Sequence, residues 1–207
     1  QRQKELVSGE NAIQTIWQRY RGRIQDDPRN ADGIGEKELL VVSFGTSFND
    51  SRVEDIKGIE DALQEAYPEW SVRRAFTAQI IINHVQARDG EKIDNMQQAL
   101  QRAVDNGVKE LVVQPTHLMH GAEYDELVSA VEEYRDQFTP VRIAEPLLGE
   151  VGSDATTINS DKKAVAEAVT SVAVSEAGFD SLDADKRSRN SVCISGTRNI
   201  PYRKGIL

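Results

Sequence analysis

The sequence predicts an α/β fold, a doubly wound parallel sheet of about four strands flanked by helices, with an amino-terminal helical extension. Between residues 38 and 150, short apolar runs alternate with amphipathic helical patterns. The runs are apolar almost throughout, which is typical of parallel strands that are covered on both faces. The first run, beginning at Glu38, ends in Ser-Phe-Gly-Thr-Ser just before a helical pattern, as the carboxyl end of such a strand often does.

Residues 1–37 are interpreted as an extension that precedes the sheet. An amphipathic stretch around Ile13, Ile16, Trp17, Tyr20 and Ile24 predicts a peripheral helix. The turn-rich residues 26–35 predict a linker between that helix and the sheet.

Residues 38–150 are expected to form one α/β domain. Its strands are predicted at 39–44, 72–76, 111–113 and 141–144, and its helices around 53–63, 80–85, 94–106 and 124–131. Residues 151–190 follow as a connecting region with one clear helix, predicted over 161–176. The pattern then dissolves, and residues 191–207 are interpreted as a tail without a fold of its own.

Composition excludes several classes of function. The chain has 207 residues and a formal net charge of −9, so its overall field repels nucleic acid and anionic membranes. No apolar run approaches the roughly 18 residues of a membrane span. Cys193 is the single cysteine, which rules out an intrachain disulfide and a multi-thiolate metal site. The first residue is Gln1, so an upstream segment is expected, and the compartment stays open with the cytoplasm slightly favoured over an extracytoplasmic location.

Small and hydroxyl-bearing residues follow the predicted strands. In open α/β sheets the ligand crevice lies beyond the carboxyl ends of the strands. Free backbone N–H groups and a helix dipole at such a place suit an anionic ligand. The candidate ligand-binding residues are Ser43, Gly45, Thr46, Ser47, Thr77 and His117.

Each candidate has a plainer interpretation. The residues from Ser43 to Ser47 are also what a helix-capping turn contains, and His117 could simply fix its loop by hydrogen bonds. Metal binding is ranked below both alternatives for His117, and His120, three residues later, is expected to be solvated.

Other charged and titratable residues carry less weight. His84 is interpreted as a helix-surface residue. Arg73 and Arg74 are neighbours on a strand, so at most one of them is expected to face the crevice. Asp50, Glu54 and Asp55 are interpreted as first-turn acids that complement a helix dipole, without a catalytic role.

Several segments together resemble one family. They are Val41-Val-Ser-Phe-Gly-Thr-Ser-Phe-Asn-Asp-Ser-Arg52, Val72-Arg-Arg-Ala-Phe-Thr77, Arg88-Asp-Gly90, Val112-Val-Gln-Pro-Thr-His117 and Gly121-Ala-Glu-Tyr124. In this order, over residues 38 to about 150, they resemble the anaerobic, cobalt-early sirohydrochlorin cobaltochelatases, which are class II chelatases.

The resemblance implies a lyase-class enzyme of cobalamin biosynthesis. Two α/β halves face a cleft in which Co²⁺, itself a substrate, is inserted into the tetrapyrrole sirohydrochlorin without ATP or a further cofactor. Arg73, Arg74, Thr77 and the backbone near Gly45 would then hold the carboxylate rim of the macrocycle. The family's metal-delivering histidines and glutamate belong to later motifs, so the resemblance assigns no catalytic or metal-binding residue in this chain.

One of the family's metal-delivering histidines lies in a Gly-His-Gly-Thr motif, which this chain does not contain but which its possible codons permit in another reading frame. Codons that encode Gly196-Thr-Arg-Asn199 can be read out of frame as Gly-His-Gly-Thr, and the shifted reading of residues 193–195 permits an apolar strand. This favours a frameshift near Ser191 and an inactive fragment that corresponds to the amino-terminal half of the enzyme. Resequencing the DNA downstream of the Asp180 codon tests this interpretation.

Two other functions stay open. One is a tetrapyrrole- or metal-carrying module without catalysis, and the other is a flavodoxin-like interaction domain that binds no tetrapyrrole. If a second half is absent, an apolar face is left uncovered and self-association is expected.

Overall fold

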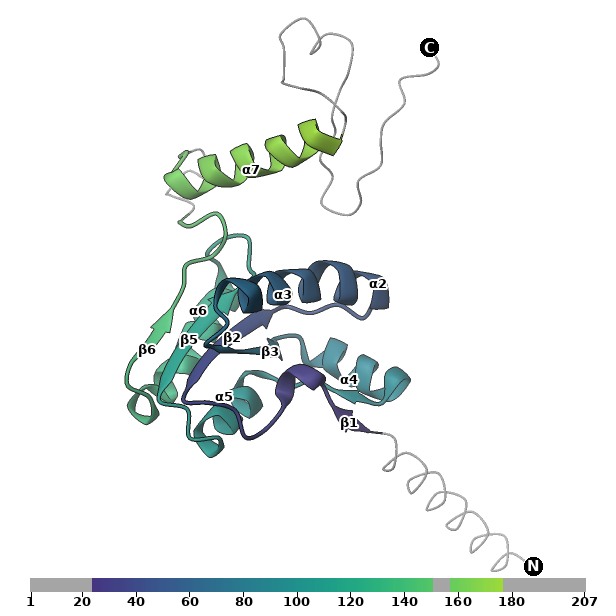
Figure 1. Ribbon diagram of the computed structural model, residues 1–207, viewed down its shortest axis with the longest axis vertical. Helices are drawn as coiled ribbons and strands as arrows, with labels where there is room; N and C mark the ends of the chain where they lie inside the picture. The colour runs from purple at the N-terminus through teal and green to yellow at the C-terminus, as the bar shows by residue number, and fades with distance from the viewer. Residues whose placement is uncertain (1–23, 151–156, 177–207) are drawn as a thin grey trace, which may run out of the picture. The chain divides into compact units, whose positions relative to one another are not determined.

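The computed structural model describes residues 24–150 and 157–176, which belong to two separate compact units, residues 1–151 and 152–207. The first unit contains a parallel sheet of four strands in the order β3-β2-β5-β6 (Figure 1). These strands are β2 (Lys37–Ser43), β3 (Ser71–Phe76), β5 (Glu110–Pro115) and β6 (Val141–Ile143). The predicted doubly wound α/β class is therefore confirmed.

The order of the strands creates a switch point between β2 and β5. From β2 the chain crosses to β3 on one side, and it later returns to β5 on the other side of β2. Leu40 of β2 lies opposite Arg73 of β3 and Val113 of β5, so the three strands run in register. Connections that leave in opposite directions open a crevice at the carboxyl ends of the two central strands.

Helices cover both faces of the sheet. One face carries α5 (Met96–Asp105) and α6 (Ala122–Glu133), and the other carries a continuous helical segment made of α2 (Asn49–Ser51), the π-helical η2 (Arg52–Ile56) and α3 (Lys57–Ala66). A further helix, α4 (Gln79–Asp89), packs through Ile82 and Val85 against Phe76 at the end of β3.

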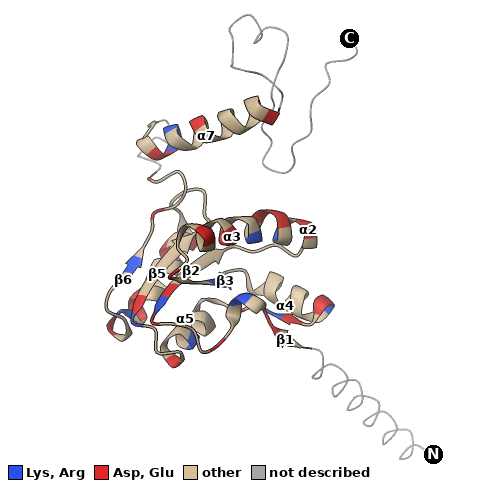
Figure 2. Cartoon of the chain, viewed as in Figure 1, with Lys and Arg blue, Asp and Glu red and all other residues tan. Residues whose placement is uncertain are grey.

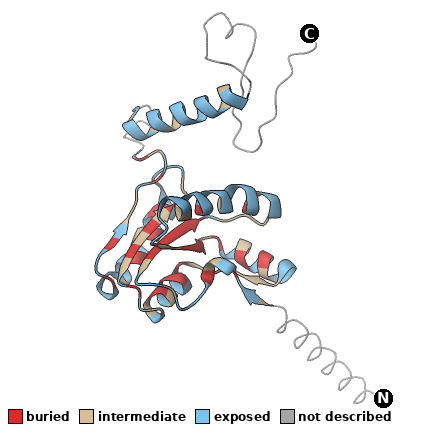
Figure 3. Ribbon diagram, in the orientation of Figure 1, coloured by how far each residue is buried: buried red, intermediate tan, exposed pale blue. Residues whose placement is uncertain are grey.

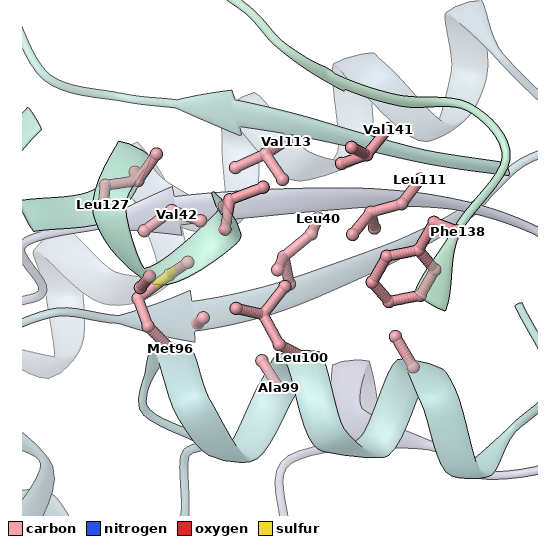
Figure 4. Packing of buried hydrophobic residues seen from close by; sticks show 14 of the residues in the cluster. Leu40, Val42, Met96, Ala99, Leu100, Leu111, Val113, Leu127, Phe138 and Val141 are labelled. Atoms are coloured by element: carbon pink, nitrogen blue, oxygen red, sulfur yellow. The ribbon is translucent and has the colours of Figure 1, made fainter. Parts of the chain in front are cut away.

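The largest core cluster lies between the sheet and α5 and α6. Figure 4 shows Leu40 and Val42 of β2 facing Met96 and Leu100 of α5. Leu39 and Val41, one position away, pack on the opposite face with Leu63 of α3. Adjacent residues thus enter different cores, which explains why the strand sequences are apolar without alternation. Buried residues accordingly concentrate in β2, β3 and β5 (Figure 3).

Residues 24–36, which include the predicted linker 26–35, lie against the outer edge of the sheet. A two-residue strand, β1 (Gln25–Asp26), pairs with β4 (Glu91–Lys92), and the short 3-10 helix η1 (Pro28–Asn30) packs on edge strand β3. Asp27 and Asn30 are each only 1% exposed. The backbone of this segment also accepts hydrogen bonds from the N–H groups of Lys109 and Glu110 at Glu36 O, at 2.8 and 3.0 Å. The segment covers an edge that would otherwise offer unpaired backbone groups.

The second unit contains α7 (Ser160–Glu176), as predicted from the sequence. The predicted helix in residues 1–23, the tail 191–207 and Cys193 lie outside the described residues. Among the residues that are described, no helix is both long and apolar enough to cross a membrane.

The carboxyl group of Glu38, on β2, is expected to make the stability of the fold depend on pH. Burial raises the pKa of its carboxyl from 4.5 to about 7, although Arg73 acts in the opposite direction. The folded state therefore holds this proton more tightly than the unfolded chain, and the free energy of unfolding falls as the pH rises through that window. We expect Glu38→Gln to flatten the fall and to gain on the order of 2 kcal/mol over the wild type near pH 8.

Urea denaturation at several pH values between about 5 and 8 measures this effect. The matched control is Glu110→Gln, which changes a carboxylate whose side chain is 38% exposed on the neighbouring strand β5. A Glu38→Gln protein that keeps the wild-type pH slope would show that Glu38 does not titrate in this range.

Candidate functional site

Hydrogen bonds from side chains and from the backbone join the carboxyl ends of β2 and β5. Thr116 lies just after β5, and its hydroxyl donates a hydrogen bond at 2.9 Å to the hydroxyl of Ser43, at the end of β2. The Thr116 N–H donates to Val42 O, also at 2.9 Å. On the other side of β2, the Thr77 N–H donates to Ser43 O at 2.9 Å. The structure therefore brings the predicted residues Ser43 and Thr77 together at the switch point. The buried Thr77 hydroxyl has no hydrogen-bond partner among the described residues.

Gly45 is required by the packing of the turn that follows β2. Its φ is +98°, a backbone conformation that residues other than glycine rarely adopt. A Cβ atom built there would lie 2.5 Å from Cδ2 of Phe76. The glycine therefore lets the turn pass directly over the aromatic ring that ends β3.

Thr46 and Ser47 shape the start of the helical segment. The Thr46 hydroxyl accepts a hydrogen bond from the Phe48 N–H at 3.2 Å, as in a hydroxyl-stabilised turn. The carbonyl of Ser47 accepts from Nη1 of Arg88 at 2.7 Å. Arg88, on α4, thereby ties this turn to the next helix along the sheet edge, and ligand binding by Thr46 and Ser47 stays a prediction.

His117 follows β5 and is held in an unusual state. Its side chain is only 9% exposed, yet neither ring nitrogen has a hydrogen-bond partner among the described residues. The nearest carboxylate oxygen, Oε2 of Glu123 at the start of α6, lies 3.5 Å from Nε2 without hydrogen-bond geometry. A buried imidazole with free nitrogens beside a carboxylate can accept or pass on a proton.

A hollow of about 520 Å³ adjoins this pair. It is lined by Phe44, Thr116, His117, Leu118, Met119, Gly121, Ala122, Glu123 and Tyr124. Sequence reasoning did not select Glu123, although it lies in the Gly121-Ala-Glu-Tyr124 segment that contributed to the family resemblance. Only the fold shows that this carboxylate faces His117.

Large apolar side chains surround the same edge of the sheet. They come from the segments that follow all four strands, and each is at least 49% exposed: Phe44, Phe48, Ile80, Leu118, Met119 and Leu147. We call these six residues the apolar collar. A gathering of exposed apolar surface at one edge is typical of a ligand- or partner-binding face.

Arg73 and Arg74 do not contribute to this edge, contrary to the role that the resemblance implied. Arg74 is buried on β3 against Glu60 and Asp27, with N–O distances of 2.7 and 2.6 Å respectively. Arg73 points toward the segment 24–36, where its Nη1 donates to the Ala31 carbonyl. Their positions in the middle of β3, rather than at its carboxyl end, explain the difference.

The other two histidines do not line the hollow. His120 contacts Asp125 at 2.8 Å and the ring of Tyr124 at 4.7 Å, and His84 is exposed on α4. In residues 24–150 and 157–176, no group of three or more His, Cys, Asp or Glu side chains is placed to hold a metal ion.

A comparison with known protein families shows to which family the chain belongs. The family model described as cobalt chelatase (CbiK) matches residues 37–178, more than half of the chain. The chain belongs to the CbiK family of cobalt chelatases. The family resemblance of the sequence is therefore confirmed, and the match agrees with the α/β class predicted from the apolar and helical patterns.

Two curated relatives of this CbiK-family chain are named as cobaltochelatases. It is 39% identical over 113 residues to "Sirohydrochlorin cobaltochelatase" of Salmonella typhimurium, covering 55% of this chain and 43% of the relative. It is 33% identical over 119 residues to "Sirohydrochlorin cobaltochelatase CbiKC" of Nitratidesulfovibrio vulgaris, covering 56% and 42%. The matched stretch thus spans about two fifths of the length of each relative.

Proposed function

We propose that this CbiK-family chain supplies one wall of the substrate cleft of a sirohydrochlorin cobaltochelatase, an enzyme that inserts Co²⁺ into sirohydrochlorin without ATP. The observation that carries the proposal is the His117–Glu123 pair beside a hollow at the switch point: a buried imidazole whose nitrogens have no hydrogen-bond partner among the described residues, next to a half-exposed carboxylate. The names of the two relatives support the choice of substrate.

The chemistry of insertion explains the composition of this edge. Sirohydrochlorin exchanges two pyrrole N–H protons for one Co²⁺, so two protons must leave the ring as the metal enters. A neutral imidazole and an ionised carboxylate both accept protons, so His117 and Glu123 can take up these two protons. The apolar collar would contact the face of the macrocycle, and the hydroxyl and N–H groups near Thr46 and Thr77 its carboxylates.

The alternative, a carrier that binds without turnover, has one observation in its favour. The described residues contain no group of three potential metal ligands, so binding of the tetrapyrrole does not require that this wall also delivers the metal.

The exposed collar further leads us to propose self-association of the chain when no tetrapyrrole is bound, which sedimentation velocity measures.

The test is an anaerobic titration of the chain with sirohydrochlorin, followed by addition of Co²⁺, with both steps monitored by absorbance. We expect binding, and we expect that His117→Ala and Glu123→Gln lower the insertion rate by about 10²-fold without a comparable loss of binding. His84→Ala, an exposed histidine on α4, is the control.

The outcomes separate the alternatives. Tight binding without insertion supports the carrier, and no binding at all contradicts both tetrapyrrole functions. If the two variants behave like His84→Ala, the pair does not take part in proton transfer.

A further inference from the structure

The turn that follows β2 is held in place by Arg88, in the last turn of α4. Nη1 of Arg88 donates to the Ser47 carbonyl at 2.7 Å, and Nη2 donates to Oδ1 of Asn49, the first residue of α2. The same turn carries two members of the apolar collar, Phe44 and Phe48. Arg88 therefore fixes a part of the edge that the proposed tetrapyrrole would contact.

The guanidinium of Arg88 is itself held by Asp89. Nε and Nη2 of Arg88 donate to the two carboxylate oxygens at 2.8 and 2.7 Å. Nη2 of Arg52, whose side chain is 8% exposed, donates to the same carboxylate at 3.2 Å. The hydrogen bond from Arg88 is the largest of the causes that lower the pKa of Asp89 to about 2. One ionised carboxylate thus serves two arginines and compensates the charge of Arg88 only in part.

Arg88 keeps donor capacity at the surface. Its side chain is 39% exposed, and Nη1, which carries two hydrogens, makes one hydrogen bond among the described residues. The helical segment of α2, η2 and α3 carries more acidic than basic residues (Figure 2), and its two cations, Arg52 and Lys57, are paired with acids of the protein. A positive group for an anionic ligand at this turn must therefore come from another element, and α4 provides it.

The turn held by Arg88 is close to the hollow beside His117. Phe44 lines that hollow. It stands three residues before Ser47, so the Cα atoms of the two residues are no more than about 10 Å apart. A tetrapyrrole with its acetate and propionate side chains is wider than this distance. Asp50, an acid in the first turn of the helix, is exposed to solvent, where salt screens its charge.

We propose that Arg88 is a substrate-binding residue, which receives a carboxylate of the tetrapyrrole while it holds the turn that follows β2. Because a tetrapyrrole is the proposed substrate, this role rests on the proposed function. Arg88 takes the place that Arg73 and Arg74, in the middle of β3, do not fill. A guanidinium that is already fixed by the protein binds a carboxylate with little further ordering. Arg88 thereby favours tetrapyrroles that are rich in carboxylates.

The test is a fluorescence titration of the full chain with two metal-free porphyrins at neutral pH. Uroporphyrin carries an acetate and a propionate on every pyrrole, whereas coproporphyrin carries a methyl group in place of each acetate. The comparison therefore isolates the contribution of the carboxylates. We expect the wild type to bind uroporphyrin more tightly. Arg88→Gln should weaken the binding of uroporphyrin by about tenfold and that of coproporphyrin by less, so that the preference narrows.

Arg88→Lys separates the contact with the ligand from the effect on the turn. Lysine keeps the charge but cannot hold all of the partners of Arg88 at once, so we expect an intermediate affinity and a retained preference for uroporphyrin. A loss as large as that of Arg88→Gln, and equal for both porphyrins, would overturn the proposed contact. The control is Arg135→Gln, which removes an exposed arginine that pairs with Glu132 and should change neither affinity.

A titration with sirohydrochlorin distinguishes failure of this role from failure of the proposed function. If the wild type binds sirohydrochlorin and Arg88→Gln binds it equally well, the role of Arg88 is contradicted and the proposed function stands. If the wild type binds none of the three tetrapyrroles, both proposals fall. With Co²⁺ added, Arg88→Gln should need more sirohydrochlorin for half-maximal insertion, yet keep the rate at saturation within about twofold of the wild type, unlike His117→Ala.

Discussion

Replacing Gly45 by alanine is expected to lower the free energy of unfolding by about 2–4 kcal/mol. Two costs add. The backbone at φ +98° is strained for any residue with a Cβ atom, and the new methyl group would lie 2.5 Å from the ring of Phe76, which is fully buried between β3 and α4. Neither the turn nor the ring can move without disturbing the end of β2 or the packing of Ile82. Denaturation in urea, monitored by circular dichroism, measures the change.

Gly58→Ala is the matched control. Gly58 lies near the start of α3, and no atom beyond its chain neighbours and its own turns of helix lies within 4 Å of the Cβ position. Alanine is favoured over glycine inside a helix by up to about 1 kcal/mol, so this variant should be as stable as the wild type or more stable. Equal effects of the two substitutions would show that Gly45 is not constrained by Phe76.

Replacing Arg74 by methionine is expected to destabilise the fold by about 3–5 kcal/mol. The substitution keeps much of the side-chain volume but leaves Asp27 and Glu60, which are 1% and 0% exposed, without their shared cation. Asp27 belongs to the segment that covers the β3 edge. Amide hydrogen exchange should therefore report faster exchange in residues 24–36 as well as a lower global stability.

The control for this prediction is Arg135→Met, which removes an ion pair with Glu132 whose side chains are 50% and 47% exposed. Exposed pairs contribute little, so a change of no more than about 0.5 kcal/mol is expected. If Arg74→Met costs no more than this control, the buried network does not hold the segment in place.

Local patterns predicted most of the regular structure. The apolar run after Glu38 and the amphipathic pattern of 94–106 correspond to β2 and α5, because each repeats with the period of its element and is bounded by turn residues. The π-helical turn η2 and the two-residue strands β1 and β4 were not predicted. Elements this short span too few residues to show a periodic pattern of apolar residues, and their hydrogen bonds depend on neighbours distant in sequence.

The candidate site was predicted only in part. Its position at the ends of the strands follows from the α/β pattern, which selected Ser43, Thr77 and His117. The partner of His117 could not be selected, because Glu123 stands among other acidic residues at the start of a helix and nothing local distinguishes it. The same holds for Arg73 and Arg74, whose sequence neighbourhood is equally compatible with a place in the crevice.

The sequence by itself determined the fold class, the order of strands and helices along the chain, and the CbiK family, since periodicity and motifs are properties of contiguous residues. Only the tertiary structure decided which polar and charged groups are paired and which are buried without a partner. Arg74 is matched by Asp27 and Glu60, whereas Arg73 and His117 are buried with unused nitrogens. Pairing depends on distances between residues far apart in the chain and on the water that folding removes around them, and neither is written in local sequence.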